Sequence, residues 1–101
     1  MTMHDTIEDS RFIIAQCRLK SGTVGGIIVL DLSTAGCLID RGALKFRPEQ
    51  RLLMRLPGLE YIPSTVLWVE DDRVGIEFER PLHDAVLAHL TRAIRRRALA
   101  A

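Results

Sequence analysis

The sequence predicts an all-β fold with one helix: a six-stranded antiparallel β-barrel followed by a C-terminal α-helix. Three observations support this prediction. Six short segments have the apolar alternation or the β-branched content of strands. Turn residues separate these segments at short intervals, which is typical of a small barrel. After Pro81 the apolar period changes to four residues, which predicts one helix packed on the barrel.

The first three strands are expected at residues 11–19, 24–32 and 37–39. In the first segment, the odd positions from Ile13 to Leu19 are apolar and small or branched, so one strand face is expected in the core. The sequence Lys20-Ser21-Gly22 then indicates a turn. In the second strand, Gly25-Gly26 indicates either a bulge or a close approach of another segment.

The other three strands are expected at residues 51–56, 61–69 and 74–78. Pro57-Gly58 ends the fourth strand. Pro63 within the fifth strand indicates a sheet edge or a bulge, because proline cannot donate to a strand ladder. Trp68 lies beside Val69 in the same strand, and its expected role is packing.

A helix is expected near residues 83–97. Apolar residues recur every four positions from Leu82 to Ile94, so one helical face is apolar. Asp84 suits the positive end of the helix dipole, and the three arginines at residues 95–97 suit its negative end. These arginines form either a solvated helix end or a contact for phosphate or a partner protein.

The composition is that of a single globular domain with one core. The chain has 101 residues, of which 48% are hydrophobic and 27% charged, and its net charge of +1 gives no case for a nucleic acid polymer as partner. It has no apolar run of about 18 residues, so no membrane span is expected. Residues 1–10 are polar and acidic, which predicts a flexible arm before a domain at residues 11–101, and the absence of a secretory signal pattern predicts a cytoplasmic location.

Catalysis finds little support in the sequence. Cys17 and Cys37 each lie in an apolar stretch and are expected as buried thiols rather than as a disulfide or half a metal site. His83 and His89 fall on different faces of the predicted helix. Metal-ligand spacings, a phosphate-binding glycine loop and a nucleophile elbow are all missing. We therefore expect no enzyme activity, no metal and no cofactor.

The strongest functional signal is the run from Asp31 to Gly36, which follows an apolar strand. It places a carboxylate, the Ser33 hydroxyl and a glycine together where the strand turns. The carboxylate accepts hydrogen bonds in pairs, the hydroxyl donates or accepts, and glycine permits backbone geometries closed to other residues. These groups suit the edge of a small polar ligand. They equally suit the backbone of an ordinary turn, and the residues alone leave both alternatives open.

The chain resembles the PilZ domain family in two motifs. Members have Asp/Asn-x-Ser-x-x-Gly after the second strand, which Asp31, Ser33 and Gly36 match. A later strand pair reads Trp-Val, a turn, and Gly-hydrophobic-Glu-Phe, which Trp68-Val69 and residues 75–78 match. The resemblance covers about residues 11–94. It implies a six-stranded barrel that binds the bacterial second messenger cyclic di-GMP.

The family's second ligand motif, Arg-x-x-x-Arg near the first strand, is incomplete in this chain. Arg11 fits the second arginine, but Ile7 stands where the first is expected, and no other arginine precedes Arg11. A missing charged donor costs about 1.5–3 kcal/mol, so weakened binding is expected unless Arg41, Arg47 or the arginines at 95–97 substitute. The resemblance thus implies a ligand-binding set of Arg11, Asp31, Ser33 and Gly36.

Two functions are compatible with these residues. The first is a cyclic di-GMP-binding signalling module or adaptor, with weakened binding, whose state is sensed by an unidentified effector protein. The second is a degenerate PilZ-type protein that does not bind the nucleotide and acts as a protein–protein interaction module. Arg11 and the intact Asp31 motif favour the first function, and Ile7 favours the second. The sequence identifies neither the partner nor the oligomeric state.

Overall fold

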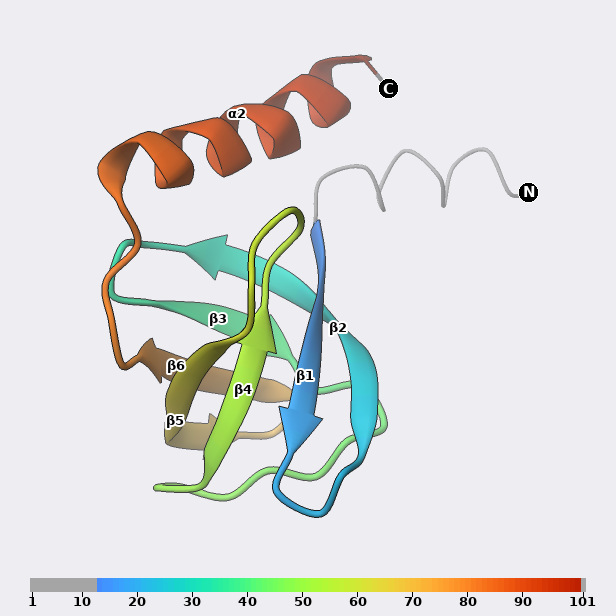
Figure 1. Ribbon diagram of the computed structural model, residues 1–101. Coiled ribbons are helices and arrows are strands. Elements are labelled where there is room, and N and C mark those ends of the chain that lie inside the picture. The colour runs from blue at the N-terminus through green and yellow to red at the C-terminus, as the bar shows by residue number, and fades with distance from the viewer. Residues whose placement is uncertain (1–12, 101) are drawn as a thin grey trace, which may run out of the picture.

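The computed structural model describes residues 13–100, and the side-chain surroundings of residues 13–92. It shows six antiparallel strands followed by one helix, which confirms the predicted fold class (Figure 1). The expected flexible arm at residues 1–10 lies outside the described residues. The elements are β1 (Ile13–Leu19), β2 (Val24–Leu32), β3 (Gly36–Asp40), β4 (Arg51–Arg55), β5 (Ile62–Glu70), β6 (Arg73–Phe78) and α2 (Asp84–Ala100).

The six strands close into a barrel in the order β1-β2-β3-β6-β5-β4. Two three-stranded meanders build it, one from β1, β2 and β3 and the other from β4, β5 and β6. β3 pairs with β6 and β1 pairs with β4, both antiparallel. Because both seams are hydrogen-bonded, none of the described strands is left as an open edge.

The hydrophobic core fills the interior of the barrel. In β1, Ile13, Ala15 and Cys17 are buried while Ile14 is 59% exposed, which confirms the predicted alternation. Inward-facing residues of all six strands belong to the same cluster. The one buried polar side chain among the described residues, Ser64, donates its hydroxyl hydrogen to the Ile62 carbonyl at 3.0 Å.

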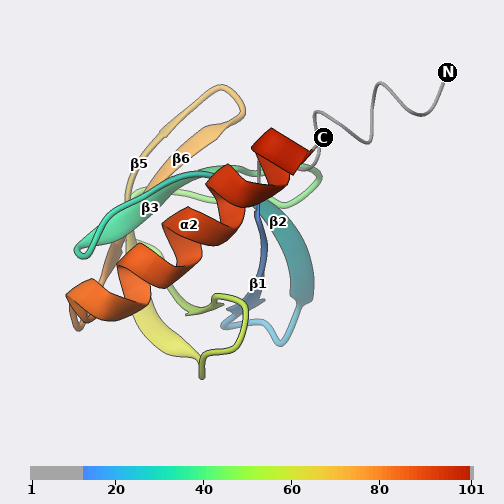
Figure 2. The ribbon, with the colours of Figure 1, turned by 90° about the horizontal axis from the view of Figure 1, so that it is seen from above.

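Helix α2 lies across one end of the barrel (Figures 1 and 2). Leu82, just before the helix, and Leu90 within it are buried in the core cluster, and the partly buried Val86 packs against that cluster. The predicted four-residue period is therefore confirmed at these three positions, and Asp84 lies in the first turn as expected. The described chain contains no helix with the length and apolarity that a membrane span requires.

Two bulges interrupt the barrel at positions that the sequence pattern does not reveal. Leu30 is an extra residue in the pairing of β2 with β3, and Leu67 is an extra residue in the pairing of β5 with β6. A bulge bends its strand and changes which side chains face outward. At Gly25 the ladder is continuous, and a close approach takes the place of a bulge, because an added Cβ would lie 3.0 Å from Leu44 Cδ1.

Pro63 lies neither at a sheet edge nor at a bulge, so that prediction was wrong. It pairs with Leu53 of β4, whereas the ladder between β5 and β6 begins one residue later, at Ser64. The Pro63 carbonyl accepts a hydrogen bond from the Glu79 N–H at 2.8 Å. The Pro63 nitrogen points to the same side of the strand as its carbonyl, toward β6. Because the ladder with β6 does not extend to Pro63, the hydrogen that proline lacks removes no strand hydrogen bond.

The backbones of β3 and β6 approach each other closely at Gly36. An added Cβ there would overlap the Ile76 carbonyl oxygen and lie 3.1 Å from the Glu77 Cα. Both are backbone atoms, so they cannot rotate away as the end of a side chain would. Gly36 is therefore required for the seam between the two meanders.

We expect Gly36→Ala to lower the free energy of unfolding by about 1–3 kcal/mol, because the added methyl group forces β3 away from β6. Urea unfolding followed by circular dichroism measures this change. The matched control is Gly26→Ala in β2, where the added Cβ would lie 3.5 Å from Ile14 Cγ2, an ordinary contact. Equal destabilisation by the two substitutions would contradict the role of the close approach.

Cys17 and Cys37 are both buried free thiols, as predicted. Loss of hydration raises the pKa of the Cys17 thiol, an effect opposed in part by a backbone hydrogen bond from Gly25. Burial also raises the pKa of the Cys37 thiol to about 12. Both thiols are thus held in the neutral form, which lowers their reactivity toward thiol reagents.

The raised pKa of Cys37 predicts a loss of stability at alkaline pH. Above the thiol pKa of the unfolded chain, about 8.5, the unfolded state loses a proton that the folded state keeps until about 12. The free energy of unfolding should therefore fall by up to about 1.4 kcal/mol per pH unit in this window. Denaturant unfolding from pH 8 to 11 tests this slope, and Cys37→Ala should flatten it. An unchanged slope in that variant would assign the pH dependence to other groups.

Candidate functional site

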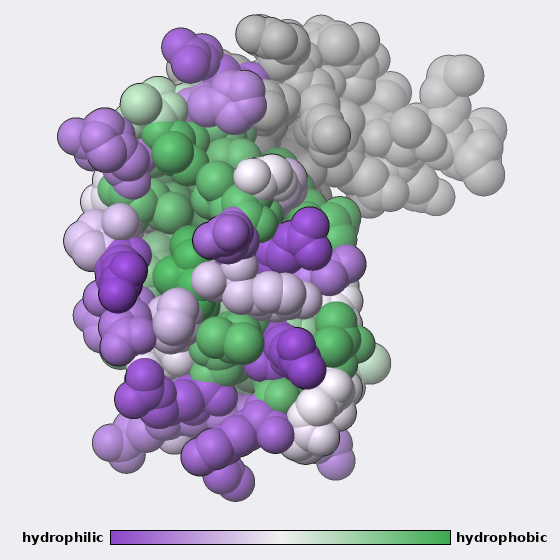
Figure 3. Space-filling view, viewed as in Figure 1, coloured by the Kyte–Doolittle hydropathy of each residue, from purple (hydrophilic) through white to green (hydrophobic). Residues whose placement is uncertain are grey.

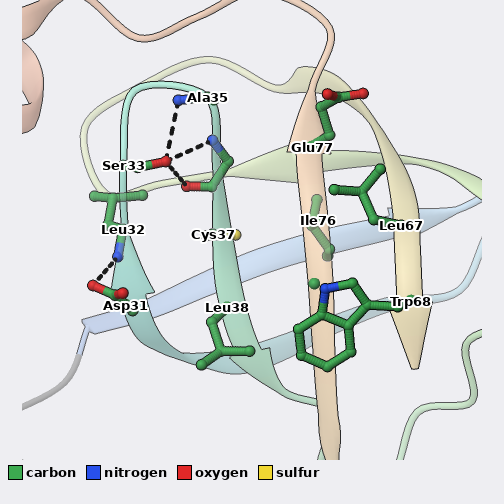
Figure 4. Close-up of a pocket in the computed structure, with 12 residues that line it drawn as sticks. Asp31, Leu32, Ser33, Ala35, Cys37, Leu38, Leu67, Trp68, Ile76 and Glu77 are labelled. Atoms are coloured by element: carbon green, nitrogen blue, oxygen red, sulfur yellow. Dashed lines mark hydrogen bonds between the residues drawn. The ribbon is translucent and has the colours of Figure 1, made fainter. Parts of the chain in front are cut away.

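The turn between β2 and β3 is organised by the Ser33 hydroxyl (Figure 4). Its oxygen accepts hydrogen bonds from the Ala35 and Gly36 N–H groups, both at 3.2 Å, and it donates to the Gly36 carbonyl at 3.3 Å. The Ser33 N–H donates to the same carbonyl at 2.9 Å. The hydroxyl therefore serves the turn itself, which is one of the two alternatives that the sequence left open.

Asp31, at the end of β2, offers a carboxylate to solvent beside this turn. Its Oδ1 accepts a hydrogen bond from the Leu32 N–H at 2.9 Å, which orients the carboxylate along the strand. Within residues 13–92 its Oδ2 has no hydrogen-bond or ion-pair partner. One carboxylate oxygen is thus held in place while the other remains open to a ligand with N–H donors.

The bulge at Leu67 in β5 forms the opposite side of the site. Because it adds one residue between the pairs Val66–Ile76 and Trp68–Gly75, two consecutive apolar side chains face outward. Leu67 is 52% exposed and Trp68 is 42% exposed. Packing, the role expected for Trp68, is therefore only part of what its side chain does, because the ring packs against Gly75 of β6 and is also exposed. The unbroken apolar run from Val66 to Val69, which departs from strand alternation, was the available signal.

The Trp68 indole lies over the neighbouring strand β6 (Figure 4), where it covers Gly75. An added Cβ on Gly75 would overlap the indole Nε1 and Cε2 atoms. Glycine at this position thus lets one face of the ring rest on the backbone of β6. The indole is held flat against the barrel with much of its surface open to solvent, which is the arrangement of a stacking platform.

A shallow pocket of about 260 Å³ lies between the turn and the bulge. Asp31 and Ser33 line it on one side, Leu67 and Trp68 on the other, and Glu77 of β6 lies between them (Figure 4). Asp31 and Glu77 carry the formal charges of the lining, and none of its described residues is a lysine or an arginine. The pocket combines hydrogen-bond acceptors with an aromatic face and is electrostatically negative.

The structure brings together three of the four expected ligand residues, because Asp31, Ser33 and Gly36 all line this pocket. Arg11, the fourth, lies outside the described residues, as does Ile7. The first described residue, Ile13, pairs with Val29 of β2, so the chain enters the barrel two residues along β2 from Asp31.

Of the basic residues considered as substitutes, the two whose side chains are described, Arg41 and Arg47, do not line this pocket. The Arg41 guanidinium donates to the carbonyls of Asp71 and Leu44 at 3.1 and 3.2 Å and contacts the Asp72 carboxylate at 3.7 Å, so it is held at the other end of β3. Arg47 lines a separate cleft. The side chains of the arginines at 95–97 lie outside the part of the chain whose side chains are described. Among the described side chains, no cation that could replace the missing arginine lies at this site. Groups of three metal-ligating side chains are likewise absent among the described residues.

We expect Gly75→Ala to displace the Trp68 indole from β6, because the added methyl group occupies the position of the ring. Trp68 is the one tryptophan of the chain, so fluorescence excited selectively in tryptophan reports on it alone. The emission maximum should shift to the red as the ring becomes more hydrated. Gly26→Ala, in which no indole is near, is the control. An unchanged emission spectrum in Gly75→Ala would contradict the contact.

Comparisons with known proteins support the family suggested by the motifs. The family model described as "PilZ domain" matches residues 12–96. None of the curated proteins matches the sequence. Among solved structures, the chain is similar to the PilZ domain of CeSA from a cellulose-synthesizing bacterium, with a TM-score of 0.55 and 14% sequence identity over 88% of this chain and 91% of that one. At this identity the likeness shows the fold, whereas the family model spans most of the sequence: the chain belongs to the PilZ domain family.

Proposed function

We propose that the chain is a bacterial signalling module that binds cyclic di-GMP weakly at the pocket between Asp31 and Trp68, and that an effector protein senses the bound state. PilZ domains are non-catalytic binding modules and typically bind this nucleotide. The observation that carries the proposal is that Asp31, with one carboxylate oxygen unbonded among the described residues, lines the same pocket as an exposed, backbone-supported indole.

The two sides of the pocket suit the two parts of a guanine base. A carboxylate accepts hydrogen bonds from the ring N–H and the amino group of guanine, which present two adjacent donors. The flat face of Trp68 offers stacking, which contributes about 1–3 kcal/mol per base where single-stranded nucleic acids bind proteins. Ser33 and Gly36 act on the ligand indirectly, because they fix the turn that positions Asp31.

The phosphates of the ligand need cations from outside the described pocket lining. Cyclic di-GMP carries two negative charges, and the described lining contributes Asp31 and Glu77. Arg11 is two residues before the start of β1 and supplies the guanidinium that the family motif places near the ligand. With Ile7 at the other motif position, we expect a dissociation constant above about ten micromolar.

One specific observation favours the alternative, a PilZ-type interaction module that has lost nucleotide binding. The pocket has two carboxylates and no described cation, so the phosphates of a nucleotide are repelled unless Arg11 compensates. The alternative keeps the barrel and the exposed Leu67 and Trp68 as a protein contact surface.

Calorimetric titration with cyclic di-GMP tests the proposal with two variants that are expected to change the dissociation constant differently. Asp31→Ala should weaken binding by at least about tenfold, because guanine donors lose their acceptor. Glu77→Ala removes the same charge from the same pocket but no expected ligand contact, so it should leave binding unchanged or tighter. Equal effects of the two substitutions would contradict specific guanine recognition by Asp31.

Ile7→Arg in the same titration separates the two functions. It should tighten binding by about 1–3 kcal/mol, since it restores a charge-assisted contact. Submicromolar binding by the unmodified protein would show that another cation already fills this role. Absence of binding by both proteins would reject nucleotide recognition and favour the interaction module.

A further inference from the structure

A basic groove crosses the end of the barrel that lies away from α2. The turn between β1 and β2, the segment between β3 and β4, and the start of β4 meet there (Figure 1). They enclose a cleft of about 480 Å³ lined by Lys20, Lys45, Phe46 and Arg47, among others. A second cleft of about 470 Å³ shares Leu19, Lys20 and Arg51 with the first and continues along β4. We call the two together the basic groove.

Positive charge is concentrated in this groove. Five of the 14 basic residues of the chain line it, together with one of the 13 acidic residues, Glu49. The lining thus carries an excess of four positive charges, whereas the whole chain has a net charge of +1. Figure 3 shows hydrophilic side chains gathered at this end of the barrel. The five basic residues are Arg18, Lys20, Lys45, Arg47 and Arg51.

These cations are largely unneutralised by the described part of the chain. Arg51 contacts the Glu79 carboxylate at 3.8 Å, with both side chains more than half exposed, so this pair contributes little. The other four basic side chains of the groove have no ion pair with any described residue. Like charges crowded at one end repel one another and do not stabilise the fold. An anionic ligand would relieve that repulsion.

The loop that carries Lys45 and Arg47 is fixed by hydrogen bonds to the barrel. The Glu49 N–H donates to the Val66 carbonyl at 2.7 Å, and the Val66 N–H donates to the Gln50 carbonyl at 2.9 Å. The Gln50 side chain in turn accepts from the Arg47 N–H at 3.0 Å. Glu49 is held at a φ of 69°, a conformation that residues other than glycine rarely adopt. The groove is therefore preformed, which lowers the entropic cost of binding.

The shape and lining of the groove identify the class of ligand. The partly buried Leu19 and Phe46 provide apolar surface between the basic side chains. A compact anion such as phosphate would use neither this apolar surface nor the length of the two joined clefts. Phe46 is the one aromatic residue of the lining, and it is half-buried, so successive nucleic acid bases would lack stacking partners. Arginine forks match carboxylates in a bidentate way.

We propose that the basic groove binds an extended, acidic segment of a partner protein, with an apolar side chain of that segment seated on Leu19 and Phe46. This interaction uses none of the residues of the Asp31 pocket and holds whether or not that pocket binds a nucleotide. It places a partner site at the end of the barrel remote from α2.

The probe that tests this proposal is a synthetic acidic peptide, acetyl-Glu-Asp-Glu-Leu-Glu-Asp-Glu-amide. Titrated into the ¹⁵N-labelled protein at low salt, it should shift the amide signals of residues 18–21, 45–47 and 49–51 in a saturable manner. Affinity should fall as ionic strength rises, because the pairs are exposed. A peptide with Ser in place of Leu should bind several-fold more weakly.

Charge reversal within the groove provides the decisive comparison. Lys20→Glu/Arg47→Glu should weaken peptide binding by at least about tenfold. The matched control, Arg73→Glu/Arg92→Glu, makes the same charge change at exposed residues outside the groove and should alter affinity less than about twofold. Spectra of the free variants establish that both remain folded.

Three outcomes would overturn the proposal. The first is equal weakening by the control variant, which would indicate bulk charge alone. The second is a set of signal shifts that maps away from the groove. The third is displacement of the peptide by a decathymidine oligonucleotide or by phosphatidylglycerol vesicles at a lower concentration than unlabelled peptide requires. That result would assign the groove to nucleic acid or to a lipid surface instead.

Discussion

The close approach of β3 to β6 is the constraint on which both the barrel and the candidate site depend. It joins the two meanders, and it is possible only because Gly36 presents no Cβ to the Ile76 carbonyl. The same approach brings the Ser33 turn, at one end of β3, alongside β6, on which Trp68 rests. Without this seam, the strands would form one open sheet joined through β1 and β4, with Asp31 and Trp68 toward its opposite edges, and the pocket between them would not exist.

Two parts of the barrel surface differ in their chemistry. The pocket on the wall beside the β2–β3 turn carries two carboxylates and an exposed indole, whereas the groove at the end away from α2 carries five basic residues and a single acid. The near-neutral net charge of the chain hides this separation. A net charge describes solubility and average attraction, whereas recognition depends on where the charges lie. For this barrel, the negative pocket and the basic groove therefore present opposite electrostatic surfaces to a ligand.

Much of the fold could be predicted from the sequence because it rests on local patterns. The alternation in β1, the four-residue period from Leu82 to Leu90 and the turn chemistry around Ser33 each reflect a single segment. The bulges at Leu30 and Leu67 could not be predicted in this way, because a bulge is defined by the register of two strands.

The candidate site could be predicted only in part, for the same physical reason. Asp31, Ser33 and Gly36 lie on one turn and form a contiguous motif, whereas the exposure of Trp68 depends on the bulge beside it and on the missing side chain of Gly75 across the ladder. The basic groove is assembled from three segments, and only the closed barrel brings them together.

Closure of the barrel also determines the order of events during folding. The hairpins β1–β2 and β5–β6 join neighbouring segments and form through short loops, but the seams β1–β4 and β3–β6 join segments that are far apart in the sequence. Such long-range pairings close late, because the entropy of the intervening chain is lost before contacts compensate for it. The Asp31 turn belongs to one meander and Trp68 to the other. A chain that folds in this order has half of the pocket early and a complete pocket only when the β3–β6 seam closes.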